Sequence, residues 1–234
     1  MRLDCVFFEL EGILVETAVA RRMAVDAALR ESGSPIPSSA VDAAFAESAP
    51  ATFDRLAEAV ARQSEGGMDA TDTVLLALRA ERIFSSSMAT GATLVDGARE
   101  KLEELASRTR LAVVTRASRQ VARRLLELAE LETATVLVAS DDPVPPKPSG
   151  RPYELALSRL PGRGMAGRPL VVALEDCHDG AVASMAAGVP CVRIGSGVEG
   201  REMVTGGASA TLPSLERVTW EMLASLAGER MEIS

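Results

Sequence analysis

Short apolar runs rich in β-branched residues recur along the chain and alternate with longer stretches in which apolar positions follow helical periodicity. This alternation is typical of a parallel sheet flanked by helices. The predicted strands are 3–8, 111–115, 135–139, 170–174 and 191–194, with a weaker sixth at 208–212. The predicted helices of the same region are 96–108, 118–130, 152–160, 179–187 and 214–226.

The alternation is interrupted between the first and second predicted strands. There the segment 17–93 shows only helical patterns separated by turn-forming residues, at 19–31, 41–47, 53–63 and 71–84. A helical block inserted between two strands of one sheet predicts a helical cap domain at 17–93. The remainder, 1–16 and 94–234, is predicted to form an α/β, Rossmann-like core domain with five or more parallel strands. Strand 3–8 should be central, between the strands that begin at Leu111 and Leu170.

Composition limits the classes of partner. The 234 residues carry a formal net charge of −8, whereas nucleic acids and anionic membranes attract basic surfaces, so neither is predicted as a partner. No segment approaches the ~18 consecutive apolar residues of a membrane-spanning helix. Cys5, Cys177 and Cys191 lack metal-ligand spacing and are predicted to be free thiols, which indicates the reducing cytoplasm.

Two carboxylates follow the first predicted strand. Glu9 and Glu11 lie two residues apart, and side chains at that spacing in an extended chain point to the same side. Gly12 then permits a sharp turn. The pair suits a nucleophile with a general acid, or an ion cage. An ordinary solvated strand end is the third interpretation, and this stretch alone leaves all three open.

The next two candidate residues, Thr115 and Lys147, are predicted to bind an anion. Thr115 ends the strand 111–115 just before a helix, where a hydroxyl and free backbone amides can hold an anion, while Ser118 caps that helix. Lys147 lies in a proline-stiffened loop that can direct its ammonium group inward. In isolation, a solvated lysine or a proline-rich ligand for another domain would explain this loop better.

A second group of acids follows the strand 170–174. Glu175 and Asp176 are adjacent, so their charges repel each other, and oxygen ligands of this kind suit Mg²⁺. Asp179 is either a further ligand or a residue that stabilises the helix dipole. His178, the only histidine, is interpreted as a surface residue.

In open α/β sheets ligands bind at the carboxyl ends of the strands, where these residues would meet. Together they resemble the four motifs of the haloacid dehalogenase-like hydrolase superfamily, in its order and at its usual intervals. The resemblance covers nearly the whole chain and is closest to the helical-cap subgroup of β-phosphoglucomutase-like and phosphoglycolate phosphatase-like enzymes. Its motifs here are the stretches 8–17 and 111–118, Lys147-Pro148, and 175–180.

The resemblance implies a Mg²⁺-dependent phosphohydrolase acting on a small phosphorylated metabolite, as a monomer or homodimer. Glu9 would be the catalytic nucleophile, and Glu11 would protonate the leaving group and activate water. The cap would close over the site and choose the substrate. Phosphate would be bound by Thr115, Arg116 and Lys147, and Mg²⁺ by Glu9, the backbone carbonyl of Glu11, Glu175 and Asp176.

The sequence departs from the family pattern at four motif positions. Glu9 and Glu11 stand where the family has aspartates, and each adds one methylene, roughly 1.5 Å of reach. A misplacement of about 1 Å can cost on the order of 10²-fold in rate, whereas the retained charge should preserve metal binding better than turnover. Cys177 replaces a usual serine. Arg116 replaces a small or amide residue and is predicted either to contact phosphate or to point to solvent.

These departures leave a second function open. A catalytically silent family member would bind a phosphorylated ligand or act as a scaffold, and Glu9 favours that alternative. Dehalogenation is disfavoured because the relatives that perform it lack an acid at the position of Glu11. Mutase activity is disfavoured because Arg21 stands where mutase-like members carry a histidine. Arg21, Arg22 and Arg55 are candidate substrate contacts in the cap.

Overall fold

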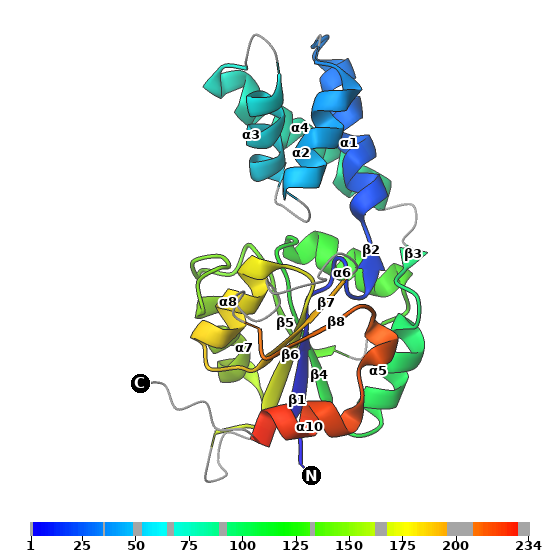
Figure 1. Ribbon diagram of the computed structural model, residues 1–234, viewed down its shortest axis with the longest axis vertical. Coiled ribbons are helices and arrows are strands. Elements are labelled where there is room, and N and C mark those ends of the chain that lie inside the picture. Colours follow the sequence, from blue (N-terminus) through cyan, green and yellow to red (C-terminus); the bar gives the residue numbers. More distant parts are fainter. Residues whose placement is uncertain are drawn as a thin grey trace. The chain divides into compact units, whose positions relative to one another are not determined.

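A computed structural model describes residues 2–34, 36–48, 53–64, 68–88, 93–131, 134–161, 168–195 and 208–228, with the side chains of 46–48 left aside. The chain divides into two compact units (Figure 1). One unit comprises Met1–Glu16 and Thr93–Ser234, and the other comprises Thr17–Ala92. No helix among the described residues is long and apolar enough to cross a membrane.

The first unit is built on a six-stranded sheet in the order β5-β4-β1-β6-β7-β8, and every strand pair is parallel. The predicted Rossmann-like α/β fold is confirmed, with β1 central between β4 and β6. The strands are β1 (Cys5–Phe8), β4 (Arg110–Val114), β5 (Ala134–Val138), β6 (Val171–Glu175), β7 (Cys191–Ile194) and β8 (Ala210–Leu212).

Helices cover both faces of this sheet (Figure 1). α7 and α8 pack on one face, where the side chains of Phe7, Ala112, Val138 and Ala173 are buried with Tyr153 of α7. α5 and α10 pack against β4 and β6 on the other face. The helices are α5 (Ala98–Ala106), α6 (Arg119–Leu128), α7 (Arg151–Arg159), α8 (His178–Ala186) and α10 (Trp220–Gly228), with a 3₁₀ turn, η1 (Leu215–Arg217).

A short antiparallel pair was missed in the sequence. β2 (Val15–Glu16) pairs with β3 (Thr93–Leu94), and Glu16 lies opposite Thr93. The helical block expected to extend through Thr93 therefore ends before it, because this residue belongs to a strand of the first unit. Two-residue strands carry no readable alternation of apolar and polar positions, so the pattern could not reveal them.

The second unit consists, in its described part, of α1 (Ala18–Glu31), α2 (Ser38–Ser48), α3 (Phe53–Gln63) and α4 (Ala70–Met88). The buried side chains of α4 recur at helical spacing, and α1 and α3 pack against it. Two of the arginines predicted as candidate substrate contacts interact with other residues of this unit. The Arg21 guanidinium lies 4.8 Å and 5.1 Å from the ring centroids of Phe53 and Phe84. Arg22 forms ion pairs with Asp26 and Asp42.

An ion-pair cluster lies beside β5, at the edge of the sheet. Asp142 is buried and accepts hydrogen bonds from Arg119 and Arg159, both at 2.6 Å, and from the backbone amide of Ala139 at 2.8 Å. Arg159 also donates to the carbonyl of Leu137 on β5, 3.1 Å away. Hydrogen bonding from Arg159, outweighing the effect of burial, holds the pKa of Asp142 below its usual value.

Replacing Asp142 by asparagine is expected to lower the free energy of unfolding at pH 7 by about 1–3 kcal/mol, since charged hydrogen bonds are lost. A depressed carboxyl pKa contributes stability above the unfolded-state pKa of about 4, and that contribution disappears as pH falls through the folded-state value. Asp142→Asn should therefore flatten the acid limb of stability against pH, measured by urea unfolding between pH 3 and pH 7. An unchanged acid limb would show that the cluster contributes no pH-dependent stability.

Candidate active site

Strand register places the candidate residues at one edge of the sheet. Phe8, the last residue of β1, lies opposite Val113 of β4 and Leu174 of β6. The backbone amide of Glu9 continues this pairing by donating to the Leu174 carbonyl at 3.0 Å. Glu9 therefore leaves β1 beside the final residue of β6, Glu175. Thr115 directly follows β4 at the same edge.

Lys147 connects the three strand ends. Its ammonium group lies 2.8 Å from Glu9 Oε2, 2.5 Å from Glu175 Oε1 and 2.8 Å from the carbonyl oxygen of Val114. An ammonium group has three protons to donate, so all of them are used here. The Lys147 side chain is 1% exposed, which excludes the solvated lysine that its loop alone had left open.

Tyr153 completes a clamp that also comprises Glu9, Lys147 and Glu175. Its only trace in the sequence was a single tyrosine six residues after Lys147. Its hydroxyl donates to Glu175 Oε1, and its ring centroid lies 5.3 Å from Lys147 Nζ. The ring also packs at 6.0 Å from Phe7 beneath the site. Glu175 Oε1 thus receives two donors, which fixes the orientation of its carboxylate.

The charges of the clamp are strongly coupled. Burial favours the neutral form of Glu9, but the positive charges of Lys147 and Arg116 and hydrogen bonding from Lys147 and Thr115 lower its pKa below the usual range. Burial raises the pKa of Glu175, and the charge of Glu9 adds to this effect. Burial also opposes the charge of Lys147, yet Glu175 and Glu9 raise the lysine pKa above its ordinary value. Lys147 is therefore protonated, and its charge is stabilised by Glu175 and Glu9.

Asp176 lies beside this clamp in a tight space. The backbone of Gly12, with a φ of 79°, approaches so closely that an added Cβ would lie 2.6 Å from Asp176 Oδ2. Burial, together with the charge of Glu9, raises the pKa of Asp176 to about 7. The guanidinium of Arg116 is 4.0 Å from Asp176 Oδ1, and its side chain is only 16% exposed. Arg116 therefore points into the site and not to solvent.

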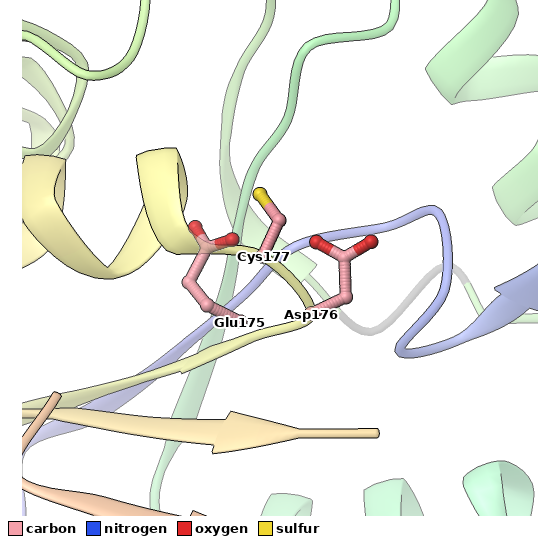
Figure 2. A group of neighbouring side chains, drawn as sticks. All are labelled: Glu175, Asp176 and Cys177. Atoms are coloured by element: carbon pink, nitrogen blue, oxygen red, sulfur yellow. The ribbon is translucent and has the colours of Figure 1, made fainter. Parts of the chain in front are cut away.

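The carboxylate oxygens of this site are suitable ligands for a divalent cation. Among the described residues, Glu175 Oε2 and both carboxylate oxygens of Asp176 are buried without a hydrogen-bond partner, a costly arrangement for polar atoms. Figure 2 shows these carboxylates on the same side of the turn between β6 and α8. Glu9, Glu11, Glu175 and Asp176 carry four formal negative charges against two positive charges on Lys147 and Arg116. Carboxylate oxygens with an excess of two negative charges suit Mg²⁺.

The other candidates are placed as follows. Thr115 is buried, and its hydroxyl accepts a hydrogen bond from the Ala117 amide at 3.1 Å. Ser118 caps α6 by accepting from the amide of Val121. Glu11 is buried two residues after Glu9 and its backbone bridges to Val15. His178 is exposed at the start of α8. Cys5, Cys177 and Cys191 are free and buried.

A parallel α/β sheet with an inserted helical unit and an acidic, lysine-clamped edge defines the class of haloacid dehalogenase-like proteins. The model of the haloacid dehalogenase-like hydrolase family matches residues 6–194, so the chain belongs to this family. A comparison with curated proteins finds no match.

Solved structures show the same fold. CbbY from Rhodobacter sphaeroides, in complex with phosphate, is 24% identical with a TM-score of 0.68 over 96% of each chain. The putative HAD-hydrolase YfnB from Bacillus subtilis, bound to magnesium, is 16% identical with a TM-score of 0.68, over 95% of this chain and 99% of that one. A putative β-phosphoglucomutase from Thermotoga maritima is 22% identical with a TM-score of 0.65, over 98% and 100%.

Proposed function

We propose that this hydrolase-family protein is a Mg²⁺-dependent phosphatase that acts on a small phosphorylated metabolite in the cytoplasm and uses Glu9 as its nucleophile. The observation that carries the proposal is the buried Lys147 ammonium, which joins Glu9 to Glu175 beside Asp176, whose carboxylate oxygens accept no hydrogen bond from the described residues. The buried cation supplies the positive charge that a phosphate group requires, and the neighbouring carboxylates supply the negative charge that its metal ion requires. Three free thiols support the reducing compartment.

The residues divide the chemistry between them. An oxygen of Glu9 attacks phosphorus, the bond from phosphorus to the leaving oxygen breaks, and Glu11 gives its proton to that oxygen. Water then attacks the phosphorus of the acyl-phosphate while Glu11 takes the water proton, which releases phosphate and restores Glu9. Thr115, Arg116 and Lys147 bind the phosphoryl oxygens. Glu9, the Glu11 carbonyl, Glu175 and Asp176 would hold Mg²⁺, which would neutralise charge between the phosphate and the carboxylates.

Phosphate binding requires an exchange of partners at Lys147. All three of its protons are donated within the protein, so a phosphoryl oxygen must replace one of the present acceptors. Glu175 is additionally held by Tyr153, and Val114 is fixed in β4, which makes Glu9 the acceptor that is released. Release of Glu9 from Lys147 also frees the oxygen that attacks.

A specific observation favours the alternative of a silent phosphate-binding protein. Both carboxylate oxygens of Glu9 are engaged, Oε2 with Lys147 and Oε1 with the amide of Leu10 at 2.9 Å. The extra methylene lets the carboxylate fold back onto its own backbone. In this alternative Glu9 serves only as a partner for Lys147, and the protein binds a phosphorylated ligand without turnover.

Mg²⁺ is expected to raise the melting temperature of the natural protein by about 5–10 °C at 100 times its dissociation constant, because such a ligand contributes about 2.7 kcal/mol to the native state. Asp176→Asn should abolish this increase, since it removes a metal-binding oxygen. Calorimetry with and without Mg²⁺ measures the effect. Asp54→Asn is the matched control, because Asp54 is an exposed carboxylate of α3 outside the site. An equal Mg²⁺ effect in both variants would place the metal elsewhere.

A further inference from the structure

Cys177 lies within the acidic cluster at the turn from β6 to α8. Its Sγ and one carboxylate oxygen from each of Glu175 and Asp176 lie within 4.8 Å of one another, a spacing that one metal ion can bridge. Figure 2 shows the three side chains projecting from the same side of this turn. The thiol is free and buried, so it is directed into the cluster and not toward solvent.

The two carboxylates beside the thiol have oxygen atoms that are available as metal ligands. Glu175 is fully buried, and its Oε1 is occupied by Lys147 and Tyr153. Its Oε2 has no hydrogen-bond partner in the described part of the chain, and neither has either oxygen of Asp176, whose side chain is 7% exposed. In metal sites, hydrogen-bond donors typically hold one oxygen of a carboxylate, so that its second oxygen faces the metal ion.

The approach of α8 supports the orientation of Glu175. A Cβ added at Gly180, in the first turn of α8, would lie 1.9 Å from Glu175 Oε2. The absence of a side chain there leaves this oxygen room next to the helix, where a larger residue would displace it. The carboxylate is thus fixed by Lys147 and Tyr153 on one oxygen, while the other lies close to Gly180 and accepts no hydrogen bond from the described residues.

Sulfur changes which cation such a cluster prefers. Mg²⁺ takes oxygen ligands and has little affinity for thiolate, whereas Zn²⁺ and Co²⁺ bind thiolate together with carboxylate. We propose that Glu175, Asp176 and Cys177 form a site for a thiophilic divalent cation of the zinc type, with a fourth position open to water. Binding forms a metal–sulfur bond, and the thiol proton passes to solvent.

This site goes beyond the proposed phosphatase function, because it would exist equally in a silent binder. It shares Glu175 and Asp176 with the proposed Mg²⁺ site, so the two cations exclude each other. Zn²⁺ would therefore compete with Mg²⁺, and Cys177 would determine how strongly it does so.

The test is an optical titration of the purified, reduced protein with Co²⁺. The natural protein should develop a near-ultraviolet sulfur-to-cobalt charge-transfer band at one equivalent, and Zn²⁺ should remove it by displacement. Cys177→Ser should lack the band and bind Zn²⁺ at least about 100-fold more weakly, since loss even of residues that only support a ligand costs on the order of 10–100-fold. Cys5→Ser is the matched control, because Cys5 is a buried thiol at the start of β1, and it should retain the band.

Thermal unfolding without metal verifies that both variants are folded. If the natural protein binds Co²⁺ without the band, or if Cys177→Ser keeps the band, the thiophilic site is refuted. The outcome is independent of the phosphatase proposal, because turnover of the natural protein with Mg²⁺ is measured separately and requires no sulfur ligand.

Discussion

Replacing Lys147 by methionine is expected to abolish phosphate binding and turnover and to lower the free energy of unfolding by about 3–5 kcal/mol. The variant removes one buried cation from Glu9 and Glu175 while it keeps most of the side-chain volume. Two buried carboxylates then remain without their shared partner, and a phosphoryl group loses its most buried positive charge. Urea unfolding measures the stability, and calorimetric titration with inorganic phosphate in the presence of Mg²⁺ measures binding.

Lys101→Met is the control for this experiment. Lys101 also donates to a carboxylate, Glu104 at 2.7 Å, and to a carbonyl, Val218 at 2.6 Å, but it lies on α5 away from the site. Its loss should cost stability without affecting phosphate binding. Adding Glu175→Gln to Lys147→Met should recover part of the stability by removing one uncompensated charge, but not phosphate binding. Phosphate binding by Lys147→Met at natural affinity would show that the clamp serves the fold alone.

The second large effect concerns the length of the side chain at position 9. Glu9→Asp is expected to raise kcat at least about 10-fold, or ~1.4 kcal/mol of barrier, with little change in KM. Shortening the side chain by one methylene draws the carboxylate away from Lys147 and prevents it from folding back onto the Leu10 amide. Both changes free an oxygen for attack, while the net charge of the site stays the same, so the expected gain lies mainly in kcat.

Steady-state kinetics on small sugar phosphates with Mg²⁺ measure this change. The control is Glu16→Asp, which shortens an exposed glutamate of β2 by the same methylene and should leave kcat unchanged. A lower kcat for Glu9→Asp would mean that the surrounding backbone is adapted to glutamate, so that Glu9 is itself the better nucleophile here.

Much of the fold was readable in the sequence, because each strand of the sheet is an apolar run followed by turn residues. β7 was predicted with its observed bounds, and the other five strands of the sheet with shifts of one or two residues. α4 extends past Phe84 to Met88 through three serines, which are weaker helix formers and ended the predicted pattern. Burial of Met88 shows that packing continues the helix.

The candidate site was only partly readable. Residue types at strand ends indicated Glu9, Thr115, Glu175 and Asp176, since strand order brings such positions together. The bond from Lys147 to Glu175 joins residues 28 apart, and the contribution of Tyr153 depends on how α7 packs on the sheet. Contacts of this kind arise from tertiary packing and leave no spacing in the sequence. The sequence showed Cys177 only as a replacement of serine, whereas in the structure its sulfur lies beside carboxylate oxygens that accept no hydrogen bond from the described residues.

The most direct test of the central proposal is phosphate release by the natural protein and by Glu9→Gln with Mg²⁺ and a panel of small phosphorylated metabolites. Glutamine keeps the length of the side chain and can still accept from Lys147, but it cannot act as a carboxylate nucleophile. The proposal predicts turnover by the natural protein and a loss of at least about 100-fold in Glu9→Gln. Equal turnover by both proteins would exclude Glu9 as the nucleophile. Binding of phosphate through Lys147 without turnover by the natural protein would establish the silent binder instead.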